Sequence, residues 1–182
     1  MKAMVLHHPG QQLQPTEIEL PPPGPGEVEI GIEACGVCRT DLHVVDGELT
    51  HPTLPLVPGH EIVGRVVRAG SGVTIQSGQR VGVPWLGHTC GACPYCERGQ
   101  ENLCDAPLFT GYTRNGGFAE ACIADAAYCF ELPDDEDPVA LAPLLCAGLI
   151  GSRSYVMAKP EARLGLYGFG AAAHILCQIA GW

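Results

Sequence analysis

Residues 59–73 read GHEIVGRVVRAGSGV, and this stretch gives the clearest local indication of the fold. Residues 62–67 are mostly β-branched, which favours a strand on a half-buried sheet. The small and turn-forming residues at 69–72 close that strand. The stretch therefore predicts one strand of a β-rich domain.

Further strands are predicted on both sides of this stretch. Four segments have strand character: residues 1–9, 28–34, 80–83 and 118–123. The second of them alternates inward and outward positions and follows a proline-rich loop, as a half-buried strand does. With 24 glycines and 16 prolines, the sequence favours many turns and short strands over a helical bundle.

The pattern changes after an acidic run near residue 135. Residues 138–155 are rich in Ala and Leu and predict a helix that is broken near Gly148 and Gly151. Residues 164–167 predict a short buried strand, followed by an apolar helix that ends at Trp182. The sequence thus predicts a β-barrel-like domain to about residue 150 and then a β-turn-α unit.

Composition and charge exclude several classes of protein. Hydrophobic residues make up 46% and charged residues 16% of the chain, which is typical of a globular protein and not of a disordered one. A net charge of −10 argues against nucleic-acid and anionic membrane partners, which select basic patches. Neither a long apolar run nor a signal peptide is evident, so a cytoplasmic location with no membrane partner is expected.

Ten cysteines are unusual in 182 residues, and their spacing carries the first chemical signal. Four of them form the pattern Cys90-x2-Cys93-x2-Cys96-x7-Cys104, with glycine, proline and asparagine between them to supply tight turns. Four thiolates on one loop satisfy a tetrahedral structural zinc ion, and such binding contributes on the order of 10 kcal/mol to ordering the loop.

Three other interpretations of this cluster compete with zinc. Disulfides are disfavoured because no signal peptide is seen. An iron–sulfur run would place the fourth cysteine three residues after the third and before a proline, whereas Cys104 comes eight residues on and precedes Asp105. A redox dithiol at Cys93 and Cys96 would follow a strand and start a helix, and this pair lies in a glycine-rich loop. Structural zinc is the favoured interpretation.

A second metal site would have to be assembled from distant residues. The candidates are Cys38, His60 with the adjacent Glu61, and Cys146. A catalytic zinc uses three protein ligands, often two Cys and one His, and leaves a fourth position open. Spacing alone does not decide the matter, because buried cysteines are commonly plain core residues and His60 could be an ordinary hydrogen-bonded histidine.

Three motifs in consistent order resemble one family across essentially the whole chain. The pattern Gly59-His60-Glu61-x2-Gly64-x5-Gly70-x2-Val73, the run CRTDLH at residues 38–43 and the four-cysteine lobe resemble the zinc-containing alcohol dehydrogenases of the medium-chain family. The resemblance implies a mixed α and β fold: a GroES-like β-barrel catalytic domain at 1–150, with a structural zinc lobe at about 86–110, and the start of an NAD(P)-binding Rossmann domain at 151–182.

The resemblance also implies roles for the candidate ligands. Cys38, His60 and Cys146 match the catalytic zinc ligands, and Glu61 matches a carboxylate that can approach the metal. Asp41 matches the group that orients the zinc-bound histidine. Two zinc ions per chain are therefore expected, one catalytic and one structural. The other cysteines match no ligand position and are interpreted as core residues: Cys35, Cys122, Cys129 and Cys177.

Four further residues gain roles from the resemblance. Thr40 and His43 match a relay that removes the alcohol proton through the cofactor ribose. Trp85 lies where the family places a wall of the substrate pocket, which would favour small primary alcohols, and a plain core aromatic is the alternative. Arg39 matches a contact to the cofactor pyrophosphate, and a solvated surface arginine is the alternative.

The cofactor side of the site is only begun in this sequence. Gly168-x-Gly170-x2-Ala173 fits the dinucleotide fingerprint, which needs a preceding strand and a following helix. The residue that distinguishes NAD from NADP should come about 20 residues later, beyond Trp182. We therefore expect a truncated, cleaved or split protein that lacks a C-terminal remainder, binds zinc and has little dehydrogenase activity by itself.

Two functions remain open at this point. The first is a zinc-dependent oxidoreductase that interconverts a small alcohol and an aldehyde or ketone with NAD or NADP. The sequence would then be a portion of that enzyme, and a homo-oligomer is one expected form of it. The second is a non-catalytic zinc-binding module derived from the same fold. A zinc-free quinone-reductase relative is disfavoured because that class lacks these ligands.

Overall fold

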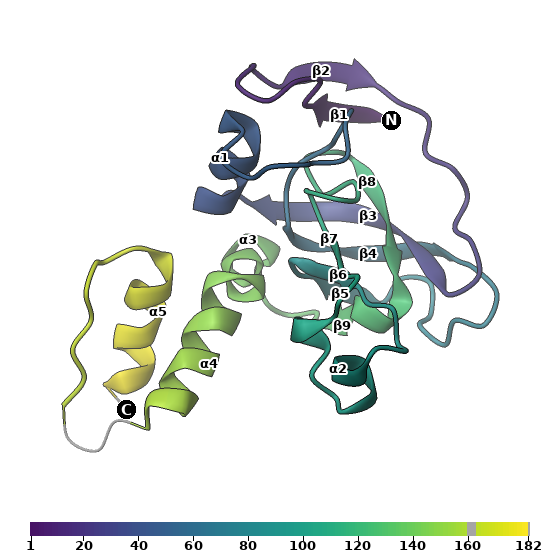
Figure 1. The fold of residues 1–182 in the computed structure, drawn as a ribbon. Helices are drawn as coiled ribbons and strands as arrows, with labels where there is room; N and C mark the ends of the chain where they lie inside the picture. The colour runs from purple at the N-terminus through teal and green to yellow at the C-terminus, as the bar shows by residue number, and fades with distance from the viewer. Residues whose placement is uncertain (160–162, 182) are drawn as a thin grey trace.

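A five-stranded antiparallel sheet forms the centre of the molecule in a computed structural model that describes residues 1–159 and 163–181 (Figure 1). Its strands lie in the order β8-β3-β4-β5-β9. Their bounds are Ala121–Asp125 (β8), Glu27–Gly36 (β3), Glu61–Ala69 (β4), Arg80–Val83 (β5) and Phe130–Glu131 (β9). The four strands predicted around residues 28–34, 62–67, 80–83 and 118–123 are all present, the last one shifted toward its C-terminal end.

The close pairing of β3 with β4 depends on a glycine in the middle of β4. A Cβ atom at Gly64 would lie 2.4 Å from the carbonyl oxygen of Gly31 on the neighbouring strand. No side chain larger than hydrogen fits there without moving the backbone. Gly64 therefore fixes the distance between the two strands, one of which begins directly after the candidate ligand His60.

Apolar side chains cover both faces of this sheet. One face carries a core of eight buried residues: Val28, Ile30, Ile62, Val66, Val81, Val83, Cys122 and Ala124. On the other face, Val63 packs against a short helical segment that contributes Leu141, Ala142 and Leu145. The period-two alternation along β3 and β4 distributes the side chains in this way.

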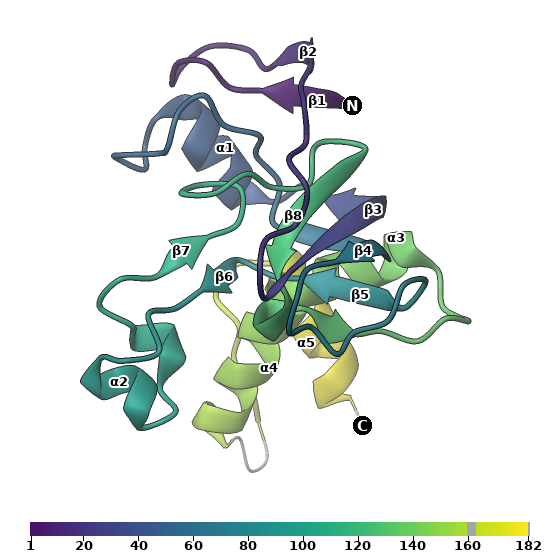
Figure 2. The same cartoon turned by 90° about the vertical axis from the view of Figure 1, so that its right-hand side faces the viewer.

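Two small sheets and one helix complete the β-rich part. Strands β1 (Lys2–Val5) and β2 (Gln14–Glu17) pair with each other, as do β6 (Leu86–His88) and β7 (Leu108–Phe109). Helix α1 (Arg39–Asp46) follows β3 directly. The segment between β6 and β7 carries α2 (Pro94–Glu97) and the 3₁₀ turn η1 (Glu101–Leu103), and it projects from the body as a separate lobe (Figure 2). The short 3₁₀ turn η2 (Ala126–Tyr128) joins β8 to β9.

After residue 137 the regular elements of the described chain are all helical. It contains α3 (Pro138–Leu141), the 3₁₀ turn η3 (Ala142–Leu145), α4 (Ala147–Ala158) and α5 (Ala171–Ala180). The predicted helix break near Gly148 and Gly151 is wrong, because the break lies at Cys146 and α4 runs through both glycines. A glycine costs a helix only about 1 kcal/mol, which α4 tolerates; Gly151 faces Leu176 of α5, and a Cβ there would lie at an ordinary contact distance of 3.4 Å.

Two expectations for the C-terminal segment also fail. Residues 164–167 form no strand, because no other strand of the described chain lies beside them to take up their backbone hydrogen bonds, and Tyr167 is fully exposed. Cys177 is exposed and not a core residue, since α5 packs on α4 by one face only. The expected helix end at Trp182 falls outside the described residues, and α5 ends at Ala180.

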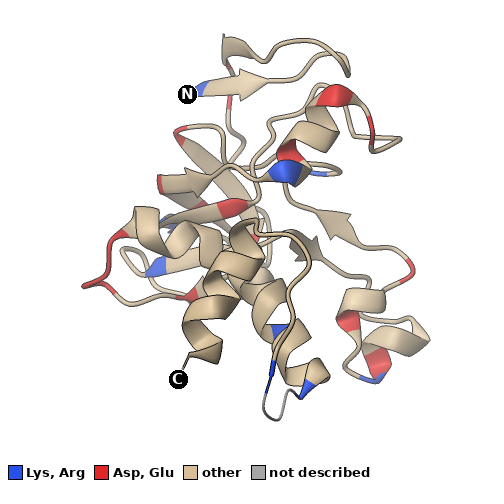
Figure 3. Ribbon diagram, turned by 90° about the vertical axis from the view of Figure 1, so that its left-hand side faces the viewer, with Lys and Arg blue, Asp and Glu red and all other residues tan. Residues whose placement is uncertain are grey.

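The mixed α and β fold class expected from the sequence is confirmed. Helices α4 and α5 lie side by side next to the β-rich body, and α5 carries none of the four charged residue types (Figure 3). Within the described ranges no single helix is both long and apolar enough to span a bilayer; only the bent pair Pro138–Leu145 with Ala147–Ala158, with 50° between its parts, meets the length and composition test.

Candidate metal centres

Three segments far apart in the sequence bring four potential metal donors together. Cys38 lies at the start of α1, His60 and Glu61 lie at the start of β4, and Cys146 lies between η3 and α4. One donor atom from each residue lies within 4.8 Å of all the others. The structure thus places the three expected catalytic ligands, together with Glu61, in one group.

The turn at Gly59 directs the side chain of His60 toward the other donors. Gly59 has a φ angle of +99°, a conformation that glycine adopts without strain. A Cβ there would lie 2.6 Å from the ring of Phe118 and 2.9 Å from the sulfur of Cys35. The glycine thus lets the chain turn tightly against its neighbours, and His60, which is 1% exposed, enters the group from the interior side.

Asp41 connects two of the ligands. Its Oδ1 atom lies 2.9 Å from Nδ1 of His60, and its Oδ2 atom accepts a hydrogen bond of 2.8 Å from the backbone N–H of Cys38. The second bond is half of a capping box, in which the sulfur of Cys38 in turn accepts from the first turn of α1. A carboxylate on Nδ1 favours the tautomer that leaves Nε2 free to bind a metal.

The distances within the group fit a tetrahedral ion. Nε2 of His60 lies 3.2 Å from the sulfur of Cys38. Zinc–sulfur and zinc–nitrogen bonds of ordinary length at a tetrahedral angle separate such atoms by about 3.6 Å. Two sulfurs, one imidazole and one carboxylate are donors that suit zinc and not calcium or magnesium. The residues present therefore fit a zinc ion.

Hydrogen bonds and burial shift the pKa values of Cys38, His60 and Cys146. The hydrogen bond with Cys146 lowers the pKa of the Cys38 thiol to about 3, while the same bond and burial raise that of Cys146. Burial would lower the pKa of His60, but the hydrogen bonds with Asp41 and Cys38 outweigh it and raise the pKa to about 9. Two coupled thiols beside a histidine favour metal binding, because a cation that binds both sulfurs displaces the remaining thiol proton to solvent.

Glu61 is the fourth donor and is held in a tight space. It is 2% exposed, and burial raises the pKa of its carboxyl group above the ordinary value. A Cβ on Gly36, which pairs with Glu61 across β3 and β4, would lie 1.9 Å from the carboxylate oxygen Oε2. The absence of a side chain at position 36 therefore gives this carboxylate the space it occupies.

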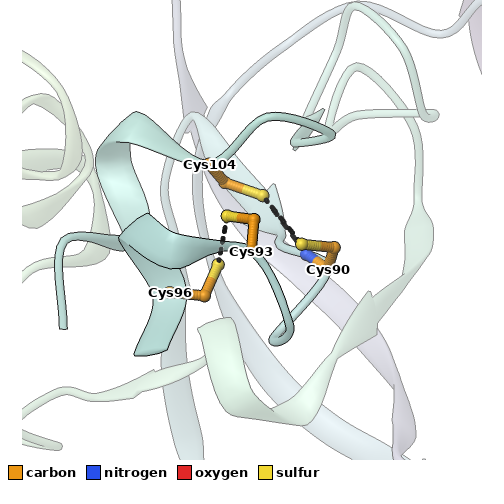
Figure 4. A group of neighbouring side chains, drawn as sticks. All are labelled: Cys90, Cys93, Cys96 and Cys104. Atoms are coloured by element: carbon orange, nitrogen blue, oxygen red, sulfur yellow. Dashed lines mark hydrogen bonds between the residues drawn. The ribbon is translucent and has the colours of Figure 1, made fainter. Parts of the chain in front are cut away.

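A second group of donors lies in the lobe between β6 and β7. The sulfurs of Cys90, Cys93, Cys96 and Cys104 lie within 4.8 Å of one another (Figure 4). The Cys93–Cys96 and Cys90–Cys104 sulfur pairs are each 3.5 Å apart. Tetrahedral zinc–thiolate geometry separates its sulfurs by about 3.8 Å, so this set also fits one zinc ion.

The alternatives for the lobe fit less well. A disulfide needs its sulfurs about 2 Å apart, and all ten cysteines, which lie within the described ranges, are free thiols. Sulfurs packed this closely leave room for one ion and not for a cluster of several irons. Backbone N–H groups of residues 96 and 105 lower the pKa of Cys93 to about 6, and the backbone N–H of Cys90 lowers the pKa of Cys104. Despite a hydrogen bond with Thr89, burial and the hydrogen bonds with Cys93 and Cys104 raise the pKa of Cys96 to about 11, so the loop favours the thiolate at two of the four positions.

The predicted relay residues lie on α1, beside the first group. Thr40 donates its backbone N–H to the sulfur of Cys38 at 3.3 Å and is half-buried. His43 is half-buried and pairs through Nδ1 with the carboxylate of Glu48. Sequence reasoning missed Glu48, although it follows the Gly47 turn that ends α1 and so returns the chain toward His43. Arg39 is exposed on the first turn of the same helix.

Trp85 belongs to an aromatic cluster at the edge of the first group. Its ring meets that of His60 edge-on at 5.2 Å and stacks on those of Phe109 at 5.0 Å and Tyr112 at 5.7 Å. Sequence reasoning missed Phe109 and Tyr112, because nothing in their spacing from Trp85 reveals that β6 and β7 pair. Stacking on both rings holds the indole in one orientation beside the histidine.

The predicted dinucleotide residues lie at the start of α5. Gly168 has a φ angle of +89°, Gly170 is the N-cap residue of the helix, and Ala173 lies in its first turn. The carbonyl of Gly170 accepts the first helical hydrogen bond from His174, at 3.0 Å. The turn and the helix of the fingerprint are therefore present, whereas the strand that should precede them is not.

Comparisons with known proteins point to one group of enzymes. The profile of the alcohol dehydrogenase GroES-like domain matches residues 24–134. A probable alcohol dehydrogenase of Mycobacterium tuberculosis is 45% identical and an alcohol dehydrogenase of Geobacillus stearothermophilus is 47% identical; each match covers 99% of this chain, and 56% and 54% of the relatives. The chain therefore spans about half the length of the curated relatives it matches.

Solved structures show the same likeness. A cobalt and zinc bound thermostable alcohol dehydrogenase from Pyrobaculum aerophilum has a TM-score of 0.89 at 30% identity, covering 100% of this chain and 55% of that one. A protein named CAD from Helicobacter pylori, complexed with NADP(H), has a TM-score of 0.90 at 27% identity, covering 99% of this chain and 55% of that one. The whole described arrangement, including the helical segment after residue 146, is thus shared with these proteins.

Proposed function

The chain belongs to the alcohol dehydrogenase family defined by the GroES-like domain, and from this premise we propose that it carries the zinc site of an oxidoreductase. The reaction is the interconversion of an alcohol with an aldehyde or ketone, with NAD or NADP as the hydride acceptor or donor. Relatives of about twice its length are named alcohol dehydrogenases, and the activity proposed here is that of the site within such an enzyme.

One observation carries the proposal: sulfurs of Cys38 and Cys146 and the ring of His60 converge with a carboxylate. A catalytic zinc with three protein ligands and an exchangeable fourth position has this donor set. Zinc bound there would supply a Lewis acid that draws electron density from an alcohol oxygen. We assign Glu61 as the donor that occupies the fourth position when no substrate does.

The other residues of the site orient ligands and move a proton. Asp41 keeps Nδ1 of His60 protonated, so that Nε2 faces the metal. Thr40 and His43 are three residues apart on α1, which places them on one face of the helix. The Thr40 hydroxyl would accept the proton of the alcohol and pass it toward His43. The pairing of its Nδ1 atom with Glu48 holds the His43 ring in place.

Trp85 is proposed as a wall of the substrate pocket. Its stacking on Phe109 and Tyr112 leaves the indole little freedom to move aside for a branched substrate. The substrate class we propose is therefore small primary alcohols. Trp85→Ala should raise kcat/KM for branched relative to unbranched alcohols, and Phe130→Ala, an exposed aromatic on β9, should leave that ratio unchanged. If Trp85→Ala leaves the ratio of kcat/KM for branched and unbranched alcohols unchanged, Trp85 is not a wall of the substrate pocket.

The start of α5 is proposed as part of the cofactor site. Gly168, Gly170 and Ala173 carry no large side chain and lie at a helix N-terminus, where phosphate groups bind to free N–H groups. Arg39 is proposed to contact the same pyrophosphate from α1.

The test of the proposed function is metal content combined with activity. The purified chain should hold about two zinc ions, and Cys146→Ser should lose one of them while retaining the ion of the four-cysteine lobe. In any preparation that reduces NAD or NADP with an alcohol, Cys146→Ser should abolish this activity together with the ion. Two zinc ions with no such reduction, even after addition of cofactor and a range of alcohols, would favour the alternative of a non-catalytic zinc-binding module. Absence of the Cys146-dependent ion would overturn both.

A further inference from the structure

Arg80 is a buried arginine whose contacts converge on one short segment of backbone. It lies at the start of β5 and is 7% exposed. Its NH1 group donates to the carbonyl oxygens of Pro133 at 3.0 Å, Asp134 at 3.0 Å and Glu136 at 2.8 Å. Its Nε atom donates to Glu33 of β3 at 2.8 Å. One nitrogen of a buried guanidinium thus contacts three carbonyl groups of residues 133–136, while another contacts the sheet through Glu33.

The segment that Arg80 holds leads directly to a candidate zinc ligand. Asp137, the next residue, caps α3 by accepting from the backbone N–H of Val139 at 3.0 Å. Helix α3 and η3 then pack on the sheet through Leu141 and Leu145. Cys146 follows η3 without any intervening residue.

The same sheet also carries the other side of the zinc site. His60 directly precedes β4 and Glu61 is its first residue; β4 pairs with β5 in register from Ile62–Val83 to Arg65–Arg80. The start of the segment is fixed to β5 as well, because the backbone N–H of Leu132 donates to the carbonyl of Arg80 at 3.1 Å. The chain that leads to Cys146 is therefore anchored to the sheet at two places, by Arg80 at residues 133–136 and by the packing of Leu141 and Leu145.

We infer that Arg80 is a positioning residue for the proposed zinc site: by fixing residues 133–136 it places the sulfur of Cys146 opposite Cys38 and His60. This inference rests on the proposed function. Arginine suits the role because its planar fork can bind a carboxylate through one edge and carbonyl oxygens through another, whereas the compact ammonium of lysine cannot do both.

A neighbouring arginine provides a matched control. Arg65 of β4 also donates to Glu33, at 2.9 Å, but its contact with the same segment is to the side chain of Asp134 and not to the backbone. It is 37% exposed at the side chain. Losing Arg65 removes two surface ion pairs and a hydrogen bond to the carbonyl of Gly78, and leaves the backbone at 133–136 held by Arg80.

The experiment measures how fast the zinc-loaded chain gives up its two ions to a chromogenic chelator. The wild-type chain should release zinc in two phases, and Cys146→Ser identifies the phase that belongs to the proposed catalytic site by abolishing it. Arg80→Lys should accelerate that phase about tenfold, which is the lower end of the loss in metal affinity on removing a group that supports a ligand, and leave the phase of the four-cysteine lobe unchanged. Arg65→Lys should change neither. The cobalt-substituted Arg80→Lys chain should also show altered absorption from the Cys146 site alone.

The outcomes separate this inference from the proposed function. If the wild-type chain lacks the Cys146-dependent phase, the proposed function fails. If that phase is present but Arg80→Lys accelerates both phases equally or neither, only the positioning role is refuted, because a general loss of stability would act on both sites. Should Arg80→Lys not fold, Glu33→Gln must show the same selective acceleration by a smaller factor, and equal or absent acceleration in that variant overturns the inference.

Discussion

Replacing Asp41 with asparagine is the most direct test of how the zinc ligands are oriented. The side chain is 2% exposed, and each of its two oxygens has one partner, His60 or the backbone N–H of Cys38. Asparagine keeps the shape but exchanges one oxygen for an NH₂ group. Only one of the two hydrogen bonds can then be retained.

Both orientations of the new amide harm the site. If its oxygen stays on His60, its NH₂ group faces the N–H of Cys38, and two donors meet at the N-terminus of α1. If the oxygen turns to Cys38, the NH₂ group faces Nδ1 of His60 and drives the ring proton to Nε2, the atom that must bind zinc. A lost hydrogen bond to a charged group costs about 1.5–3 kcal/mol.

The expected result is a loss of zinc affinity at one site only. A cost of about 2 kcal/mol corresponds to an affinity lowered about thirtyfold, which lies within the range of 10- to 100-fold known for outer-sphere partners of metal ligands. Competition with a chelator of known affinity measures this loss, and the ion of the four-cysteine lobe serves as an internal reference. Asp46→Asn, at the exposed end of the same helix, is the control. Unchanged affinity at both sites in Asp41→Asn would refute the reasoning.

Three further predictions concern stability. Gly36→Ala should lower the free energy of unfolding by about 1–3 kcal/mol, because the new methyl group overlaps the Glu61 carboxylate; thermal unfolding measures it, and Gly165→Ala, with open space around it, should be close to neutral. Cys104→Ser should lose the lobe ion and lower the melting temperature, and a melting temperature equal to that of the wild type would contradict a structural role. Burial raises the pKa of Cys122 from 9.0 to about 12, so unfolding at pH 9–12 releases its proton. Cys122 alone should therefore lower the free energy of unfolding by about 1.4 kcal/mol for each pH unit in that range. Denaturant titrations of Cys122→Ala should show a shallower fall of that free energy with pH, and a fall identical to that of the wild type would show that Cys122 does not contribute.

The sequence predicted those parts of the fold whose signals are local. The β-branched run at 62–67 became the central strand β4, and the lobe from Cys90 to Cys104 collects its four sulfurs within one loop. The distant donors Cys38, His60 and Cys146 were grouped by the resemblance to a family and not by their spacing. The structure brings them together, and their roles stay predictions.

What the sequence could not reveal depends on neighbours across space. The apolar residues 164–167 carry a strand pattern, but a strand requires a partner to satisfy its backbone, and none lies beside it in the described part of the chain. The contacts of Glu48 with His43 and of Arg80 with residues 133–136 follow from how the chain folds back on itself. No motif spacing encodes such contacts.

The two groups of metal donors differ in how much of the chain must fold before the donors come together. The lobe cluster needs only one short loop, so the entropy lost in closing it is small. The other cluster requires β3, β4 and the docked turn before Cys146, which are contacts of high sequence separation and form late. A newly made chain can therefore capture its first ion in the lobe while the second site is still open. When zinc is scarce, the four-cysteine lobe should therefore be occupied before the site of Cys38, His60 and Cys146.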